Sequence, residues 1–160
     1  MEELQLKINV GRLTEDELSP CVRQLVEKAK QATANSYSPY SHFRVGAALR
    51  LKDGTIVTGA NQENAAFPSS LCAERTAIFS AQAHYPDQPI VELAIAARNS
   101  SGEFLSDPIS PCGGCRQVIL GIEDRYQQPI TVYLYGTSGI YRIGSARDLL
   151  PFSFVDASMK

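Results

Sequence analysis

The spacing of apolar and polar residues along the chain predicts an alternation of helices and strands. Residues 4–10 alternate apolar and polar side chains, which is typical of a strand. Ser19 and Pro20 offer a helix cap followed by proline at the first helical position, and an apolar face continues to about Ser36. The further elements that the pattern predicts are strands over 43–51 and 55–59, a helix over 72–84, a strand over 90–97, a helix over 112–124, strands over 130–135 and 139–143, and a helical turn over 146–150. This order indicates an α/β protein with a mixed sheet and helices on its faces.

Length and composition indicate a single domain. The chain has 160 residues, of which 44% are apolar and 20% charged, an ordinary balance for a globular protein with a sizeable core. No repeat, low-complexity run or linker divides the sequence, so residues 1–160 are interpreted as one domain. The net charge of −2 and the lack of any Lys/Arg run disfavour a nucleic-acid partner. No apolar stretch is long enough to cross a bilayer, and residues 1–20 lack the order of a signal peptide, so we expect no membrane partner and a cytoplasmic protein.

The chemistry of the chain concentrates in three cysteines and one glutamate. Cys72 and Glu74 belong to Cys-Ala-Glu-Arg, and Cys112 and Cys115 belong to Pro-Cys-Gly-Gly-Cys-Arg. In a reducing compartment such cysteines are more readily metal ligands than disulfide partners. Three protein thiolates leave the fourth position of a tetrahedral zinc open to water, which is typical of a catalytic site. Glu74 lies two residues from the first ligand and is placed to move protons for that water, so the pattern predicts a zinc deaminase signature.

The two cysteine motifs lie where helices are expected to begin. The N–H groups and the dipole of a helix start favour an anionic thiolate, which gives a physical reason for placing Cys72 and Cys112 there. Three thiolates cancel more than the charge of zinc, so we expect Arg75, Arg116 or both to donate hydrogen bonds to sulfur and restore the electrophilicity of the metal. An ordinary surface salt bridge is the alternative for each arginine.

Two other interpretations of the cysteines stay open at this point. A structural zinc would need a fourth ligand, and Cys21, His42 and His84 are the only spare thiol and imidazoles. Cys21 is expected to pack in the core on the first helix, His42 precedes a strand, and His84 lies at a helix end. Buried or redox-active cysteines without a metal are the second alternative. Glu74 counts against both, because neither needs a carboxylate beside the site.

Four segments of the chain resemble the small, homotetrameric cytidine deaminases. The segments are Ser-His-Phe-Arg-Val-Gly-Ala-Ala-Leu from Ser41, Gly-Ala-Asn-Gln-Glu-Asn-Ala from Gly59, Cys-Ala-Glu-Arg-Thr-Ala from Cys72 and Pro-Cys-Gly-Gly-Cys-Arg-Gln from Pro111. The likeness covers about residues 20–154 and leaves 1–13 as a short N-terminal extension. It implies a three-layer α-β-α sandwich with a mixed central sheet. It also implies hydrolytic deamination of cytidine and 2′-deoxycytidine to uridine and 2′-deoxyuridine, with release of ammonia, as a step of pyrimidine salvage.

The resemblance gives the four chemical residues their roles. Cys72, Cys112 and Cys115 match the ligands of one zinc ion per chain. Glu74 matches the residue that takes a proton from water, protonates N3 of the pyrimidine and delivers a proton to the leaving amine, while activated water attacks C4. Proton transfers of this kind typically contribute roughly 10²–10⁴-fold to the rate.

Five further residues match positions that contact the substrate in that family. Asn61 and Glu63 match the pair that hydrogen-bonds the ribose hydroxyls, since an amide and a carboxylate suit a diol. Phe43 matches an aromatic residue that packs on the pyrimidine, and the backbone of Ala73 matches a group that reads the edge of the base. Phe154 matches a C-terminal aromatic residue that crosses into a neighbouring subunit, which implies a homotetramer with shared active sites.

The chain departs from the family pattern in a few places. Gln62 replaces the usual aliphatic residue, and Phe67 stands where tyrosine is common, which bears on sugar preference. The extension through Arg12 has no counterpart in the shortest members and bears on a sheet edge or a subunit contact. The alternatives to cytidine deamination are deamination of another small amino-heterocycle and a non-catalytic zinc- or nucleoside-binding module. A polynucleotide editor is disfavoured, because the composition offers no basic channel.

Overall fold

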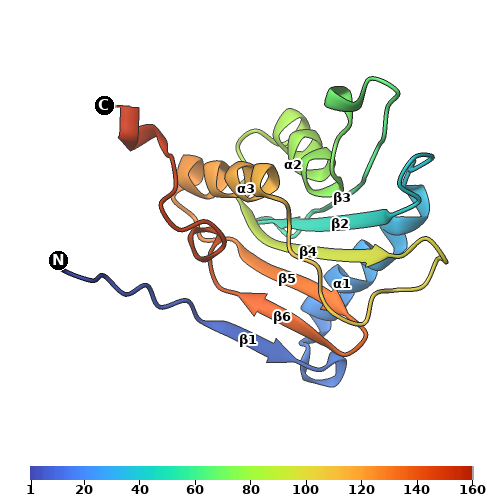
Figure 1. Cartoon of the computed structure of the whole chain (residues 1–160), viewed down its shortest axis with the longest axis horizontal. Helices are drawn as coiled ribbons and strands as arrows, with labels where there is room; N and C mark the ends of the chain where they lie inside the picture. The colour runs from blue at the N-terminus through green and yellow to red at the C-terminus, as the bar shows by residue number, and fades with distance from the viewer. Residues whose placement is uncertain (160) are drawn as a thin grey trace.

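The computed structural model describes residues 1–159 and contains a six-stranded sheet with the strand order β1-β6-β5-β4-β2-β3 (Figure 1). The strands are β1 (Val10–Leu13), β2 (Arg44–Leu51), β3 (Ile56–Ala60), β4 (Ile90–Arg98), β5 (Thr131–Gly136) and β6 (Gly139–Ile143), and the α-helices are α1 (Pro20–Ala32), α2 (Ala73–His84) and α3 (Gly113–Tyr126). The short 3-10 helices are η1 (Glu15–Glu17), η2 (Thr33–Asn35), η3 (Phe67–Ser69), η4 (Ala146–Leu149) and η5 (Asp156–Met159). Only β4 and β5 pair in parallel among these neighbours, so the sheet is mixed as predicted.

The sheet separates α1 on one face from α2 and α3 on the other (Figure 1). Along β2, Ala48 packs on the α1 side, whereas its neighbours Ala47 and Leu49 pack with α2 and α3. Successive side chains of a strand point to opposite faces, which explains this division. Strand β4 contributes to both clusters in the same way, through Ala94 and Ile95. The predicted three-layer α-β-α sandwich is confirmed.

Helix α1 begins and packs as the sequence predicts, with one exception. Ser19 Oγ accepts a hydrogen bond from the backbone N–H of Val22 at 3.4 Å, and Pro20 is the first helical residue. The predicted apolar residues of the helix are buried; they are Val22, Leu25, Val26, Ala29 and Ala32. The prediction that Cys21 packs in the core is wrong, because its side chain is exposed. Val22 takes the first buried position of the helix, and Cys21 lies about 100° around the helix axis from it.

The first strand is shorter and later than the alternation predicts. The expected strand covered residues 4–10, whereas β1 begins at Val10. Val10 pairs with Ile143, which is the last residue of β6, so the residues before Val10 have no neighbouring strand in this chain. Alternation of apolar and polar side chains marks a segment's ability to form a strand, but hydrogen-bonded pairing needs a partner strand.

No helix within residues 1–159 is long and apolar enough to span a membrane.

Candidate metal centre and substrate hollow

Two helix starts bring the three predicted ligands together. Cys72 is the N-cap of α2, Cys112 is the N-cap of α3, and Cys115 lies in the first turn of α3. Their Sγ atoms all lie within 4.8 Å of one another, and the Sγ atoms of Cys72 and Cys112 are 3.9 Å apart. Neither N-cap thiol makes a capping hydrogen bond to its own helix. Both sulfurs are therefore free to bind a common cation.

The protonation of this cluster fits a cation-binding site. The pKa of Cys72 is lowered to about 5, chiefly because it accepts a hydrogen bond from the Cys115 thiol, with the Arg75 guanidinium adding to the effect. The same contact, together with burial, raises the pKa of Cys115. Cys72 thus gives up its proton readily, whereas Cys115 retains its proton until a positive charge compensates. A set of three cysteine sulfurs suits zinc, which binds thiolates in tetrahedral sites.

The three sulfurs form a group without a fourth side-chain ligand. Within residues 1–159, no additional His, Cys, Asp or Glu atom joins the cluster. In particular, His84 directs Nδ1 to the backbone oxygen of Ser80 at 2.8 Å, at the far end of α2. A structural zinc would lack its fourth ligand here, so the geometry favours an open coordination position over that alternative.

The two arginines that follow the cysteine motifs have different partners. Arg75 Nη2 donates to Cys72 Sγ at 3.4 Å, as the sequence predicts for one or both arginines. Arg116 instead donates from Nε to the backbone oxygen of Pro111 at 2.8 Å and from Nη1 to that of Leu149 at 3.1 Å. Arg116 therefore braces the loop before α3 and the turn η4, and Arg75 is the arginine of the two that donates to sulfur.

Glu74 lies in the first turn of α2, one position past the buried Ala73. Its side chain is only 4% exposed. Burial raises the pKa of the Glu74 carboxyl, and the nearby Cys72 thiolate raises it further. A carboxyl group in this state can hold a proton closer to neutral pH than a solvated glutamate can, which is the property required of a proton shuttle.

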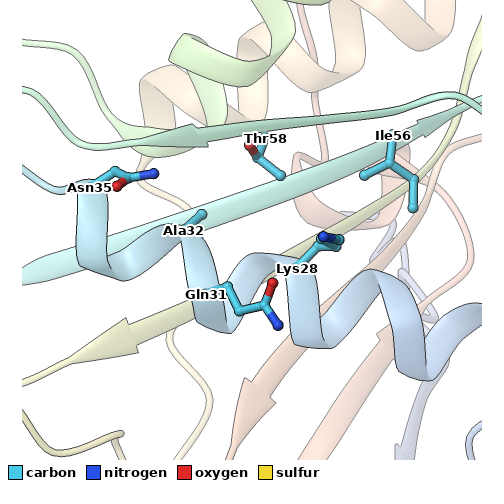
Figure 2. A pocket seen from close by; sticks show the side chains of 6 residues that line it. All are labelled: Lys28, Gln31, Ala32, Asn35, Ile56 and Thr58. Atoms are coloured by element: carbon cyan, nitrogen blue, oxygen red, sulfur yellow. The ribbon is translucent and has the colours of Figure 1, made fainter.

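A hollow of about 420 Å³ lies beside the cysteine cluster. Its walls include Cys72 and Arg75 together with Asn61 and Glu63, which come from the loop after β3. A second hollow, of about 320 Å³, lies between α1 and β3 (Figure 2). None of the predicted site residues lines that second hollow. The larger hollow therefore joins the predicted metal site to the predicted sugar-binding pair.

Asn61 is held rigidly by its own chain. Its Oδ1 accepts hydrogen bonds from the backbone N–H of Val45 at 2.8 Å and from Ser36 Oγ at 2.6 Å. Its Nδ2 donates to the backbone oxygen of Phe43 at 2.9 Å. An amide side chain has two N–H donors and one oxygen with two lone pairs. Asn61 therefore retains a single N–H for a ligand in the hollow.

Glu63 is fixed by the loop that precedes β2. Its Oε2 accepts from the backbone N–H of Tyr40 at 2.8 Å and of Ser41 at 3.3 Å, and its Oε1 accepts from Ser41 Oγ. The hydrogen bond from Ser41 is the largest cause of the lowered pKa of Glu63, so the side chain is an anion at neutral pH. A carboxylate offers about four lone-pair sites, which leaves capacity for a hydroxyl group.

The remaining predicted substrate residues do not line the hollow. Phe43 is half-buried and contributes its backbone oxygen to Asn61. Ala73 is fully buried at the start of α2. Phe154 is 58% exposed, and its backbone oxygen accepts a hydrogen bond from Gln117 Nε2 at 2.7 Å. Their roles toward a substrate stay predictions.

The sequence analysis singled out Gln62 and Phe67 as departures from the family pattern but missed the contacts that they make beside the hollow. Gln62 pairs with Leu71 through backbone bonds of 2.9 and 3.0 Å, which closes the loop that carries the sugar-binding pair. The Gln62 side chain points away from that pair and donates to the backbone oxygen of Asn35 at 3.1 Å. Phe67, which lines the hollow, stacks edge-on against Tyr40 with ring centroids 5.4 Å apart. The contacts with Asn35 and Tyr40 join residues more than twenty positions apart, so no local signal in the sequence points to them.

The sheet is mixed, and its flanking helices present three thiols and a buried carboxyl group at their N-termini. This arrangement defines a zinc-dependent deaminase. Residues 19–127 match the model of the cytidine and deoxycytidylate deaminase zinc-binding region, and the chain belongs to this family.

Individual relatives agree with this assignment. The chain is 37% identical over 137 residues to the cytidine deaminase of Halalkalibacterium halodurans, a match that covers 86% of this chain and 96% of the relative. It is 39% identical over 133 residues to the cytidine deaminase of Sporosarcina psychrophila, covering 83% and 90%. The crystal structure of the cytidine deaminase from Burkholderia pseudomallei matches with a TM-score of 0.70 and 41% identity, covering 82% of this chain and 97% of that chain.

Proposed function

We propose that this protein catalyses the hydrolytic deamination of cytidine and 2′-deoxycytidine to the corresponding uridines, with release of ammonia, as a step of pyrimidine salvage. The observation that carries the proposal is one hollow that joins the Cys72 end of the thiol cluster to Asn61 and Glu63. The Cys72 end of the hollow suits deamination of the base, and Asn61 and Glu63 suit binding of the ribose. The relatives named above are cytidine deaminases.

The cysteine cluster and Glu74 divide the chemistry between them. Cys72, Cys112 and Cys115 would hold the zinc, which when bound supplies a Lewis acid that makes water nucleophilic near neutral pH. Glu74, whose pKa burial raises, accepts a proton from the water and passes it to N3 of the pyrimidine. It then accepts the second water proton from the hydroxyl group added at C4 and delivers it to the leaving amine. The net reaction consumes one water and exchanges the amino group for an oxygen.

The arginine beside the cluster adjusts the charge of the ligands. Arg75 donates to Cys72 Sγ, which withdraws negative charge from a thiolate that would otherwise reduce the Lewis acidity of the metal. The Arg75 Nε atom is buried and has no hydrogen-bond partner among the residues described. The guanidinium thus directs its charge at the sulfur through Nη2.

The sugar-binding pair gives the site its preference for nucleosides. Asn61 has one N–H left and Glu63 has unused lone pairs, so together they can donate to and accept from a ribose hydroxyl. A site built to bond a hydroxyl strongly rejects an analogue that lacks it, because its polar groups are left unpaired. Phe43 and the backbone of Ala73 are proposed to hold the base.

We also propose a cytoplasmic homotetramer in which Phe154 completes the active site of a neighbouring subunit. Two aromatic residues near the end of the chain, Phe152 and Phe154, are 92 and 58% exposed, and the proposed subunit contact would cover them. The cytoplasm suits a cluster whose three cysteines must stay reduced to bind a metal. Light scattering of the zinc-loaded protein tests the assembly.

A panel of substrates tests the proposed function. The zinc-loaded protein is incubated with cytidine, 2′-deoxycytidine, free cytosine and adenosine, and ammonia and absorbance are followed. We expect turnover of both cytidines and at least about a hundredfold lower kcat/KM for free cytosine. Glu63→Ala should narrow this gap by harming cytidine, whereas Gln62→Ala is the matched control because its side chain points away. Turnover of another heterocycle only, or zinc binding without any turnover, contradicts the proposal.

A further inference from the structure

The N-terminal arm, residues 1–9, carries a strand-forming sequence without a partner strand in its own chain. Strand β1 starts at Val10 opposite Ile143, where β6 ends. The chain then turns into η4 from Ala146, so β6 offers no backbone to the residues before Val10. Figure 1 shows the arm running out past β6 at the edge of the sheet. The family match begins at residue 19, so family membership assigns no role to the arm.

The arm presents a continuous apolar face to solvent. Leu4, Leu6, Ile8 and Val10 are 83, 63, 44 and 52% exposed. In an extended strand, side chains alternate, so pairing would place these even-numbered residues on one face together with Glu2, and the odd-numbered polar residues on the other. An edge strand with free backbone groups and apolar side chains is a template for pairing with another chain unless charge or proline blocks it. Between residues 4 and 10 the arm has no proline, and Lys7 is its one charged residue.

We propose that the arm pairs with the same arm of a second copy of this chain, as two antiparallel strands related by a two-fold axis at Leu6. This arrangement places Leu4 opposite the partner's Ile8, Leu6 opposite the partner's Leu6, and Ile8 opposite the partner's Leu4. All three apolar residues then face apolar residues directly. The pairing covers the same patch on both chains and closes on itself, as a two-fold interface requires.

Apolar matching and charge together favour this register over its neighbours. An axis at Lys7 sets the two lysines directly opposite each other, and like charges in that position destabilise a sheet. An axis at Gln5 aligns only two apolar pairs and sets Ile8, in the middle of the apolar face, opposite the partner's Glu2. The axis at Leu6 aligns three apolar pairs and moves Glu2 out to the partner's Val10, at the end of the paired segment. It also leaves Glu3 diagonal to the partner's Lys7, an opposite-charge pair on the polar face.

The other free edge of the sheet is a poorer partner for the arm. Strand β3 forms that edge, and the hollow beside it is lined mostly by polar side chains (Figure 2). Lys28, Gln31 and Thr58 among these would meet the apolar face of the arm and leave their polar groups unpaired. The arm matches its own sequence better than it matches this groove.

Disulfide cross-linking tests the pairing and its register in the full-length, zinc-loaded protein. In a Cys21→Ser background, Leu6→Cys places two thiols directly opposite, within the Cα separation of about 4.4–6.8 Å that a disulfide needs. Gln5→Cys is the matched control, because its two thiols lie on the diagonal, about 7–8 Å apart. We expect mild oxidation to convert Leu6→Cys, but not Gln5→Cys, to covalent dimers on a non-reducing gel. No dimer from Leu6→Cys, or equal yields from both variants, overturns the proposal.

Hydrogen–deuterium exchange provides a second measurement that needs no oxidation. Paired backbone amides in residues 4–8 should exchange at least about tenfold more slowly than in a Leu4→Asp/Leu6→Asp variant, whose charges oppose pairing. Dilution should remove this protection, because pairing between chains depends on concentration. Fast exchange of residues 4–8 in the unmodified protein, or protection that persists in the variant, contradicts pairing between arms.

Discussion

Gly59 fixes the distance between β3 and the helix that carries the metal site. A Cβ atom at this position would lie 2.5 Å from the backbone nitrogen of Ala77 and 2.6 Å from the backbone oxygen of Ala73. Ordinary contact between heavy atoms begins near about 3.5 Å. In Gly59→Ala, helix α2 would have to move away from β3 by about 1 Å, because backbone atoms cannot rotate aside as side chains can.

The cost of this movement follows from the packing of the core. Overpacking a core by a methyl group typically costs about 1–3 kcal/mol, and contact with backbone atoms places Gly59→Ala at the upper end. For a chain of this length, each kcal/mol lowers Tm by roughly 2–4 °C, so we expect a decrease of roughly 6–12 °C. Ala73 lies between Cys72 and Glu74, so the shift displaces both. A displacement of about 1 Å can cost roughly a hundredfold in rate.

Gly121 provides the matched control for this prediction. It lies in α3, and an added Cβ would meet nothing within 4 Å. Alanine in a helix interior is more favourable than glycine by about 0.5–1 kcal/mol, so Gly121→Ala should raise Tm slightly and leave turnover unchanged. Differential scanning calorimetry and a cytidine assay measure both variants. A Gly59→Ala variant with the Tm and turnover of the unmodified protein would show that α2 does not depend on this contact.

Three further predictions concern the site. Elemental analysis and a cytidine assay should show loss of zinc and of activity in each of the variants Cys72→Ala, Cys112→Ala and Cys115→Ala. The control variant Cys21→Ser, at an exposed position, should retain both. An active, zinc-free Cys112→Ala variant would refute the site. Arg75→Gln should weaken zinc affinity or activity by roughly 10–100-fold, because loss of a hydrogen-bond partner to a metal ligand typically has this effect. Arg116→Gln should chiefly lower Tm, because the partners of Arg116 are backbone oxygens. Equal effects of the two variants on zinc affinity would contradict this division of roles. Phe154→Ala should raise KM for cytidine while each chain keeps its zinc, and unchanged kinetics would remove Phe154 from the substrate site.

The order of elements was predictable because it depends on local signals. Two such signals are the apolar run over 90–97 and the capping residues Ser19 and Pro20, each contained within a few residues. Strand β4 and helix α1 form as these signals predict. The prediction of a strand over 4–10 was wrong, because pairing depends on where β6 ends, more than a hundred residues away. The prediction that Cys21 is buried was wrong, because apolar character near a helix face does not fix the angle of the side chain around the helix axis.

The grouping of the three cysteines was predictable because the two motifs have the spacing that a metal requires of its ligands. Cys72 and Cys112 stand at helix starts as expected, and the sheet brings them together. The bracing of Glu63 by Ser41, and of Asn61 by Ser36, was not predictable, because these pairs come from loops that meet only after the sheet forms. Arg75 follows Cys72 by three positions and Arg116 follows Cys112 by four, yet in the fold one donates to sulfur and the other to backbone oxygens.

Glu74→Gln tests the central claim most directly, that the thiol cluster holds the metal and Glu74 moves the protons. Zinc content, cytidine consumption and ammonia release are measured in the same samples of the unmodified protein and the variant. Glutamine keeps the size of the side chain but cannot accept a proton, so the account predicts one zinc per chain in both proteins and at least about a hundredfold slower turnover in the variant. Nearly normal ammonia release by Glu74→Gln, or loss of its zinc, would contradict the account.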